Sequence, residues 1–113
     1  MKKILIVLFI SLLGFTSQAQ EKKSKNAKHT VEVQGNCEMC KKRIEKAAFS
    51  VSGVKSATWS PDDKQLHLIL NEEKTSDLEV QKAIAKVGHD TEKVKATDED
   101  YKKLHTCCAY DRN

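Results

Sequence analysis

Two hydrophobic periods alternate along residues 29–97, and their order constrains the fold more than any other feature of the sequence. Residues 30–34 alternate apolar and polar side chains with the period of a half-buried strand. Residues 38–53 place apolar side chains at helical spacing. Residues 54–60 and 65–70 again have strand character, and the turn residues between them predict a hairpin.

A second helix and a short strand complete the pattern. Thr75 or Ser76 can cap this helix, with Glu79 placed for a capping box if Ser76 is the cap, and Gly88 ends it. Residues 91–96 form the last predicted strand. The order β-α-β-β-α-β predicts an α+β fold of the ferredoxin-like type, with a four-stranded antiparallel sheet and two helices on one face.

The start of the chain has the features of a secretory signal. Lys2 and Lys3 precede an apolar run over residues 4–13, which is too short to span a bilayer and is followed by small residues suited to a signal peptidase. We therefore expect a periplasmic or secreted protein with no stable membrane insertion after cleavage. The predicted division of the chain is a signal peptide (1–19), a flexible linker (20–28), the domain (29–97) and a Cys- and His-containing extension (98–113).

The charge balance argues against nucleic acid as a partner. The net charge of the 113-residue chain is +4, and Lys2 and Lys3 of the leader contribute half of it. The sequence also contains no convincing nucleophile–base pair, phosphate-binding loop or paired carboxylate cluster. We therefore expect a binding protein that is not an enzyme.

Cys37 and Cys40 are the residues most suited to chemistry. Their spacing places one thiol in the loop after the first strand and the other on the first helical turn, so that both sulfurs can converge. The helix N-terminus and the basic residues 41–43 favour thiolates there. Thiolates are soft ligands that favour Cu(I) and Zn(II), and they also bind Hg(II). A disulfide between this pair and the tail is an alternative in an oxidising compartment.

The tail gathers further soft ligands at His105, Cys107 and Cys108. The tail could fold back and add ligands to Cys37 and Cys40, giving the higher coordination that Zn(II) prefers. It could also bind metal independently, or it could be a docked end with inert or disulfide-paired cysteines. All three interpretations remain open from the sequence.

The sequence resembles the heavy-metal-associated domain family over about residues 29–97. The resemblance rests on the Cys37–Cys40 motif, on Gly53 and the following hairpin, and on residues 87–90. It implies that Cys37 and Cys40 bind one soft metal ion and pass it to a metal-transporting P-type ATPase or to another metal efflux or uptake component. The family commonly has Met where this chain has Gly35, which predicts a less firmly held loop.

The same resemblance places His89 beside the metal loop, where many relatives have an aromatic residue. His89 is therefore either an additional ligand or a surface histidine in a turn. The function that we expect is binding and transfer or sequestration of a heavy metal ion, foremost Cu(I), with Zn(II) or Hg(II) as alternatives. A thiol-disulfide redox protein and a partner-binding domain with incidental thiols are the other classes. We expect a monomer, with a metal-bridged dimer as an alternative.

Overall fold

The computed structural model describes residues 23–104 and 106–112, so the predicted signal peptide and His105 lie outside the described residues. No helix in this described part has the length and apolar content needed to cross a bilayer. The elements in chain order are strand β1 (Ala27–Glu32), helix α2 (Glu38–Phe49), strands β2 (Val54–Trp59) and β3 (Gln65–Leu70), helices α3 (Asp77–Lys86) and α4 (Asp98–Lys102), and the 3₁₀ helix η2 (Thr106–Cys108).

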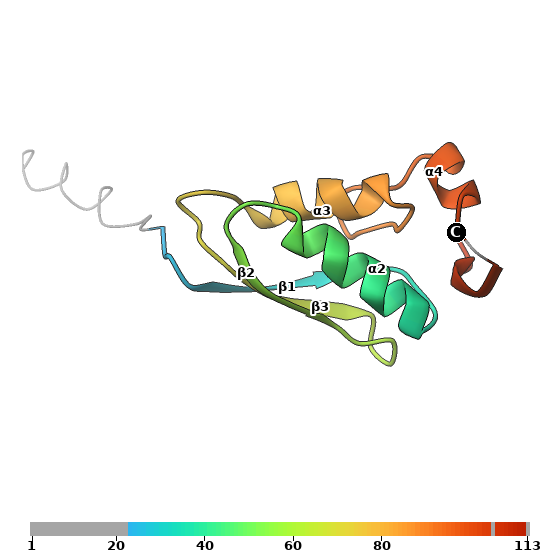
Figure 1. Ribbon diagram of the computed structural model, residues 1–113, viewed down its shortest axis with the longest axis horizontal. Coiled ribbons are helices and arrows are strands. Elements are labelled where there is room, and N and C mark those ends of the chain that lie inside the picture. Colours follow the sequence, from blue (N-terminus) through green and yellow to red (C-terminus); the bar gives the residue numbers. More distant parts are fainter. Residues whose placement is uncertain (1–22, 105, 113) are drawn as a thin grey trace, which may run out of the picture.

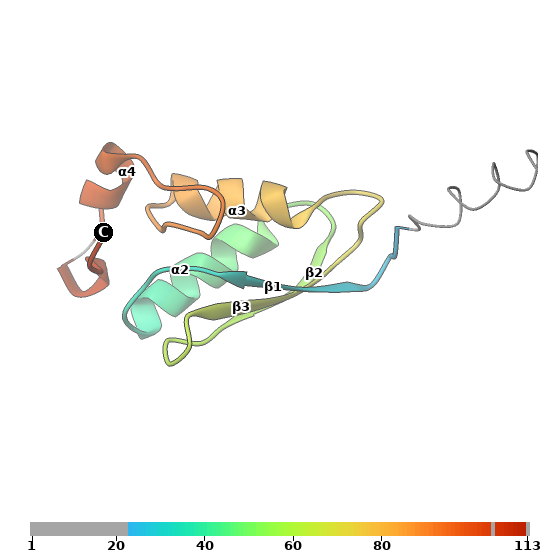
Figure 2. The same ribbon diagram turned by 180° about the vertical axis from the view of Figure 1, so that it is seen from behind.

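The strands form one antiparallel sheet in the order β1-β3-β2. The register pairs His67 of β3 with Thr30 of β1 on one side and Thr58 of β2 on the other. Helices α2 and α3 cover one face of this sheet, while α4 and the C-terminal segment lie at the end of the domain where α2 begins (Figures 1 and 2). This arrangement confirms the α+β class, the antiparallel sheet and the placement of two helices on one face.

The predicted fourth strand over residues 91–96 is reduced in the described residues to a single bridge between Thr91 and Val33. The reason is local hydrogen bonding, because the N–H of Thr91 donates to Val94 O at 2.8 Å and closes a turn. The side chain of Gln81 accepts from Lys93 N at 2.9 Å. These backbone groups are satisfied without a ladder, so the described sheet has three strands and not the predicted four.

Several predicted boundaries shift by a few residues. Strand β1 begins at Ala27, inside the segment expected to be linker, and helix α2 ends at Phe49, before Gly53. Ser76 is the cap of α3, and its hydroxyl accepts from Glu79 N at 3.3 Å. The Glu79 carboxylate accepts a hydrogen bond from Lys82 at 3.1 Å, and among the described residues it makes none to Ser76 N, so the capping box is not completed.

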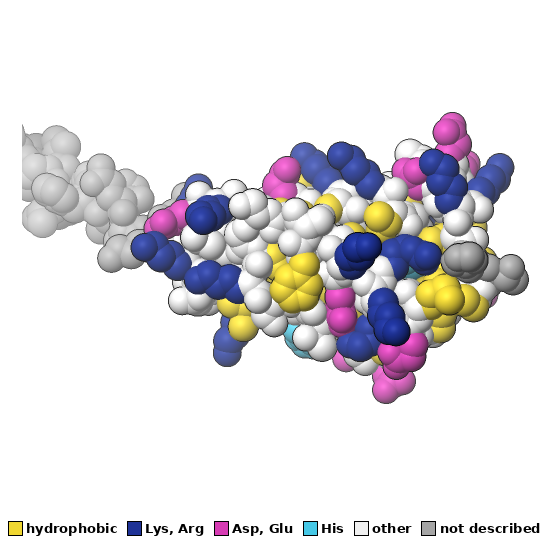
Figure 3. Space-filling model, in the orientation of Figure 1, with side chains coloured by type: hydrophobic (Ala, Val, Ile, Leu, Met, Phe, Trp, Pro, Cys, Tyr) yellow, Lys and Arg dark blue, Asp and Glu magenta, His cyan; other side chains and the backbone are white. Residues whose placement is uncertain are grey.

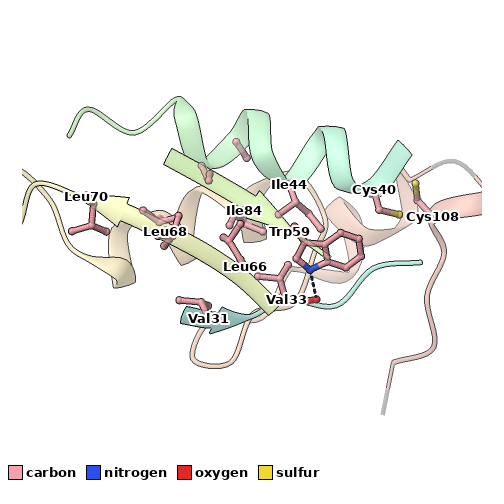
Figure 4. Packing of buried hydrophobic residues seen from close by; sticks show 14 residues of the cluster. Val31, Val33, Cys40, Ile44, Trp59, Leu66, Leu68, Leu70, Ile84 and Cys108 are labelled. Atoms are coloured by element: carbon pink, nitrogen blue, oxygen red, sulfur yellow. Dashed lines mark hydrogen bonds between the residues drawn. The ribbon is translucent and has the colours of Figure 1, made fainter. Parts of the chain in front are cut away.

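The core lies between the sheet and the two covering helices, and Trp59 is its largest buried side chain (Figure 4). The Trp59 indole N–H donates to Val33 O at 3.0 Å, which satisfies the polar atom of a side chain that is otherwise apolar. Cys40, Ile44 and Cys108 belong to the same buried cluster. The core therefore extends to the end of the domain where the cysteines gather.

The C-terminal tail is part of this packed structure, although the sequence placed it outside the folded unit. Tyr110 is 3% exposed, and its hydroxyl accepts from Asp90 N and donates to Gly88 O, both at 2.8 Å. Its ring stacks on His89 with a centroid distance of 5.7 Å. Arg112 donates to both carboxylate oxygens of Asp90 at 2.9 Å. These contacts hold the tail against the loop after α3.

Candidate metal centre

Cys37 and Cys40 meet at the N-terminus of α2. Cys37 is the N-cap residue of the helix and is half-buried, whereas Cys40 lies in the first turn and is fully buried. Cys40 is four residues before Ile44, so both side chains lie on the helix face that packs into the core. The two Sγ atoms are 3.6 Å apart. The geometry thus brings the two predicted ligands together.

A third sulfur reaches this pair from the tail. The Sγ of Cys108, in η2, lies 3.7 Å from the Sγ of Cys37, and the three sulfurs all lie within 4.8 Å of one another. All three are free thiols. Figure 4 shows Cys40 and Cys108 approaching one another from the helix and from the tail. A metal ion about 2.3 Å from each of three coplanar sulfurs separates them by about 4 Å, which is close to this spacing.

The local electrostatics divide the thiols. The backbone N–H of Cys40 stabilises a thiolate on Cys37 and, with the neighbouring thiols, lowers the pKa of Cys37 to about 7. Burial instead raises the pKa of Cys108, while the guanidinium of Arg43 beside it acts in the opposite direction. Cys37 therefore ionises more readily near neutral pH than Cys108. It is also more exposed than Cys40 or Cys108.

The loop that contains Gly35 and leads into Cys37 is supported by contacts that the sequence did not reveal. A Cβ atom on Gly35 would lie 3.0 Å from the Trp59 ring and 3.2 Å from Cys40 Cβ, so the indole fills the space under this residue. Lys64 Nζ donates to Gly35 O at 2.6 Å. Gly35 stands where the family commonly has Met, and here Trp59 and Lys64 support the loop instead. Neither residue is near the motif in sequence, so no local pattern could have identified them.

His89 lies outside the three-sulfur group. Its side chain is fully buried, and Nδ1 lies 2.8 Å from Gln34 O, which corrects the expectation of a surface histidine. Nε2 has no hydrogen-bond partner among the described residues. Burial lowers the pKa of His89 and favours the neutral ring. Of the remaining predicted ligands, His105 lies outside the described residues, and Cys107 is exposed with its Sγ 3.6 Å from Met39 Sδ.

Comparisons with solved structures identify small metal-handling domains. The CopZ metallochaperone is 26% identical with a TM-score of 0.56, over 57% of this chain and 98% of its own. Oxidized MerP from Ralstonia metallidurans CH34 is also 26% identical, with a TM-score of 0.50 over 57% of this chain and 94% of its own. The chain therefore has the fold of these small metal-handling domains, which supports the predicted resemblance to the heavy-metal-associated domain family. No family model and no curated protein matches the chain.

A third structural neighbour has the same fold as this chain. It is the Cu(I)-loaded N-terminal domain of a potential copper-translocating P-type ATPase from Bacillus subtilis, 24% identical with a TM-score of 0.55, over 58% of this chain and 84% of its own. The family resemblance implies two ligand cysteines, here Cys37 and Cys40. In this chain the tail places Cys108 beside them.

Proposed function

We propose that the protein is an exported soft-metal-binding protein that binds Cu(I) through Cys37, Cys40 and Cys108 and transfers or sequesters it without catalysis. The observation that carries this proposal is the convergence of three free thiols within 4.8 Å. Thiolates select soft ions such as Cu(I). Zn(II) generally takes four ligands in a structural site, so three sulfurs suit Zn(II) less well. Hg(II) shares the preference for sulfur and is the other cargo that the site could take.

Transfer requires that a partner's ligands reach the metal. Cys37 is half-buried, so one ligand of the site is accessible while Cys40 and Cys108 are enclosed. Lys and Arg side chains are spread over this face of the molecule with hydrophobic side chains between them (Figure 3). A groove between α2 and α3 is lined by Met39, Lys42 and Lys46, among others. This surface suits a partner with acidic groups around an apolar contact, such as the metal-binding domain of a P-type ATPase or another metal efflux or uptake component.

A Cu(I) titration of the reduced protein against a competing chelator tests the proposal. We expect one tightly bound Cu(I) equivalent. Its affinity should fall by more than about 100-fold in Cys37→Ser/Cys40→Ser, because removing two ligands should cost more than removing a residue that only hydrogen-bonds to a ligand. Cys108→Ser should weaken the same equivalent less, because two thiolates remain. Cys107→Ser is the matched control, since it removes a neighbouring thiol outside the three-sulfur group. An unchanged affinity in the double variant would refute the proposal.

A thiol-disulfide redox function is the alternative favoured by one observation, the pKa of about 7 at Cys37 beside two other thiols. Thiolates of this kind attack disulfides as well as bind metal. An insulin-reduction assay on the same reduced protein separates the two functions. We expect a rate no higher than that of free dithiol at equal concentration, and catalytic turnover that is lost in Cys37→Ser would favour the redox protein.

A further inference from the structure

Five sulfur atoms form a continuous row from the protein surface to the buried end of the core. The row begins at Met39 Sδ and passes through Cys107, Cys108 and Cys37 to Cys40. Its successive sulfur–sulfur distances are 3.6, 4.0, 3.7 and 3.6 Å. The inner three sulfurs form the site described above, whereas the outer two, from Met39 and Cys107, remain unexplained by it.

We propose that Met39 and Cys107, with Cys108 as a bridging thiolate, form a second Cu(I) site, so that the reduced protein binds two Cu(I) ions in a five-sulfur cluster. This inference rests on the proposed function, because Cys108 belongs to both sites. Thioether and thiolate sulfur are both soft ligands that select Cu(I). A bridging thiolate has further lone pairs to donate, so Cys108 can bind one ion on each side.

The spacing of the outer sulfurs fits a second ion. Two sulfurs bound at about 2.3 Å to one metal are separated by about 4 Å in a trigonal arrangement and by about 4.6 Å in a linear one. The observed 4.0 Å between Cys107 and Cys108 equals the trigonal value, and the 3.6 Å between Met39 and Cys107 lies slightly below it. Because Met39 is 46% exposed and Cys107 is also exposed, both side chains have room to adjust.

Contacts on both α2 and η2 position the outer pair, Met39 and Cys107. Met39 lies in the first turn of α2, and its Sδ lies 3.6 Å from Cys107 Sγ of the tail. The amide of Asn36 donates to Cys107 O at 3.4 Å and ties η2 to the metal loop. The outer sulfurs are therefore brought together by the same docking that places Cys108 beside Cys37.

The net negative charge of the full five-sulfur cluster is no greater than that of the inner site. Three thiolates with one Cu(I) carry a charge of about −2, and four thiolates with two Cu(I) carry the same charge, because each added thiolate is matched by one added ion. Arg43 lies beside Cys108. The Arg43 guanidinium opposes the net negative charge in both states.

Native mass spectrometry of the reduced protein titrated with Cu(I), with chelator competition in parallel, tests this inference. We expect two Cu(I) per monomer in the wild type, with the second equivalent bound at least tenfold more weakly because it gains fewer unshared thiolates. Met39→Leu/Cys107→Ser should retain the first equivalent and lose the second. Phe49→Leu changes an exposed apolar side chain at the other end of α2 and serves as the matched control that keeps both.

The outcomes separate this inference from the proposed function. One Cu(I) per monomer in the wild type, or two in Met39→Leu/Cys107→Ser, would overturn the five-sulfur cluster while leaving the inner site intact. A second equivalent found only in a dimer would overturn it as well, because that ion would be held between two chains. If the reduced wild-type protein binds no Cu(I) at all, the proposed function itself is refuted.

Discussion

The hydroxyl of Tyr110 is the clearest single test of whether the tail belongs to the fold. Tyr110→Phe keeps the ring, its stacking on His89 and nearly all of its buried area. It removes the one atom that accepts from Asp90 N and donates to Gly88 O. Each of these backbone groups then lacks its partner in a buried region, at a cost of about 1–3 kcal/mol. We expect Tyr110→Phe to lower the free energy of unfolding by about 2–6 kcal/mol.

Urea denaturation of the reduced, metal-free protein, followed by circular dichroism, measures this loss. For a domain of this size, even about 2 kcal/mol corresponds to a fall of about 8–16 °C in Tm. Tyr101→Phe is the matched control, because its half-buried hydroxyl donates only to Tyr110 O, and we expect a loss of about 1 kcal/mol. A loss below about 0.5 kcal/mol in Tyr110→Phe would show that the tail does not dock as described.

Two further predictions concern the loop that the tail covers. Burial lowers the pKa of His89, so the unfolded chain binds a proton below about pH 6.5 that the folded protein does not. Stability should therefore fall as the pH decreases from about 6.5, by up to about 1.4 kcal/mol per pH unit, and His89→Phe should lack this component in pH-dependent urea titrations. Gly88→Ala should lower Tm by at least about 8 °C, because φ is +105° and a Cβ would lie 2.8 Å from Asp100 O. An unchanged Tm would contradict the close packing of α4.

The sequence predicts most of the fold because hydrophobic period reports directly which face of an element is buried. Leu66, Leu68 and Leu70 alternate with polar or half-exposed residues, and the structure buries all three on one face of β3. The prediction over residues 91–96 was wrong because such a short segment has competing partners for its backbone. The Gln81 side chain and a local turn at Thr91 provide them, and neither leaves a mark on hydrophobic period.

The metal loop shows a second limit of sequence reasoning. The Cys37 and Cys40 spacing indicates their convergence because both residues lie on one helical turn. Cys108 is 71 residues away from Cys37, and its placement depends on tail contacts that are distant in sequence. Tyr110, Gly88 and Asp90 make those contacts. From the sequence, a tail that folds back to Cys37 and Cys40 was therefore only one of three alternatives. Tertiary packing brings Cys108 to the pair and leaves Cys107 at the surface.

The proposed three-sulfur site couples metal binding to docking of the tail, because Cys108 is the ligand that the tail supplies. If only the docked tail presents Cys108, the apparent affinity of the three-sulfur site is reduced by the fraction of molecules in which the tail is docked. By reciprocity, metal bound through Cys108 stabilises docking by the same free energy. Tyr110→Phe should consequently lower the affinity for the tight Cu(I) equivalent in proportion to the fraction of molecules in which the tail undocks. This loss should never exceed the loss seen in Cys108→Ser. If the proposed function holds, the tail contacts thus set how strongly the domain retains a metal ion against a partner's thiolates.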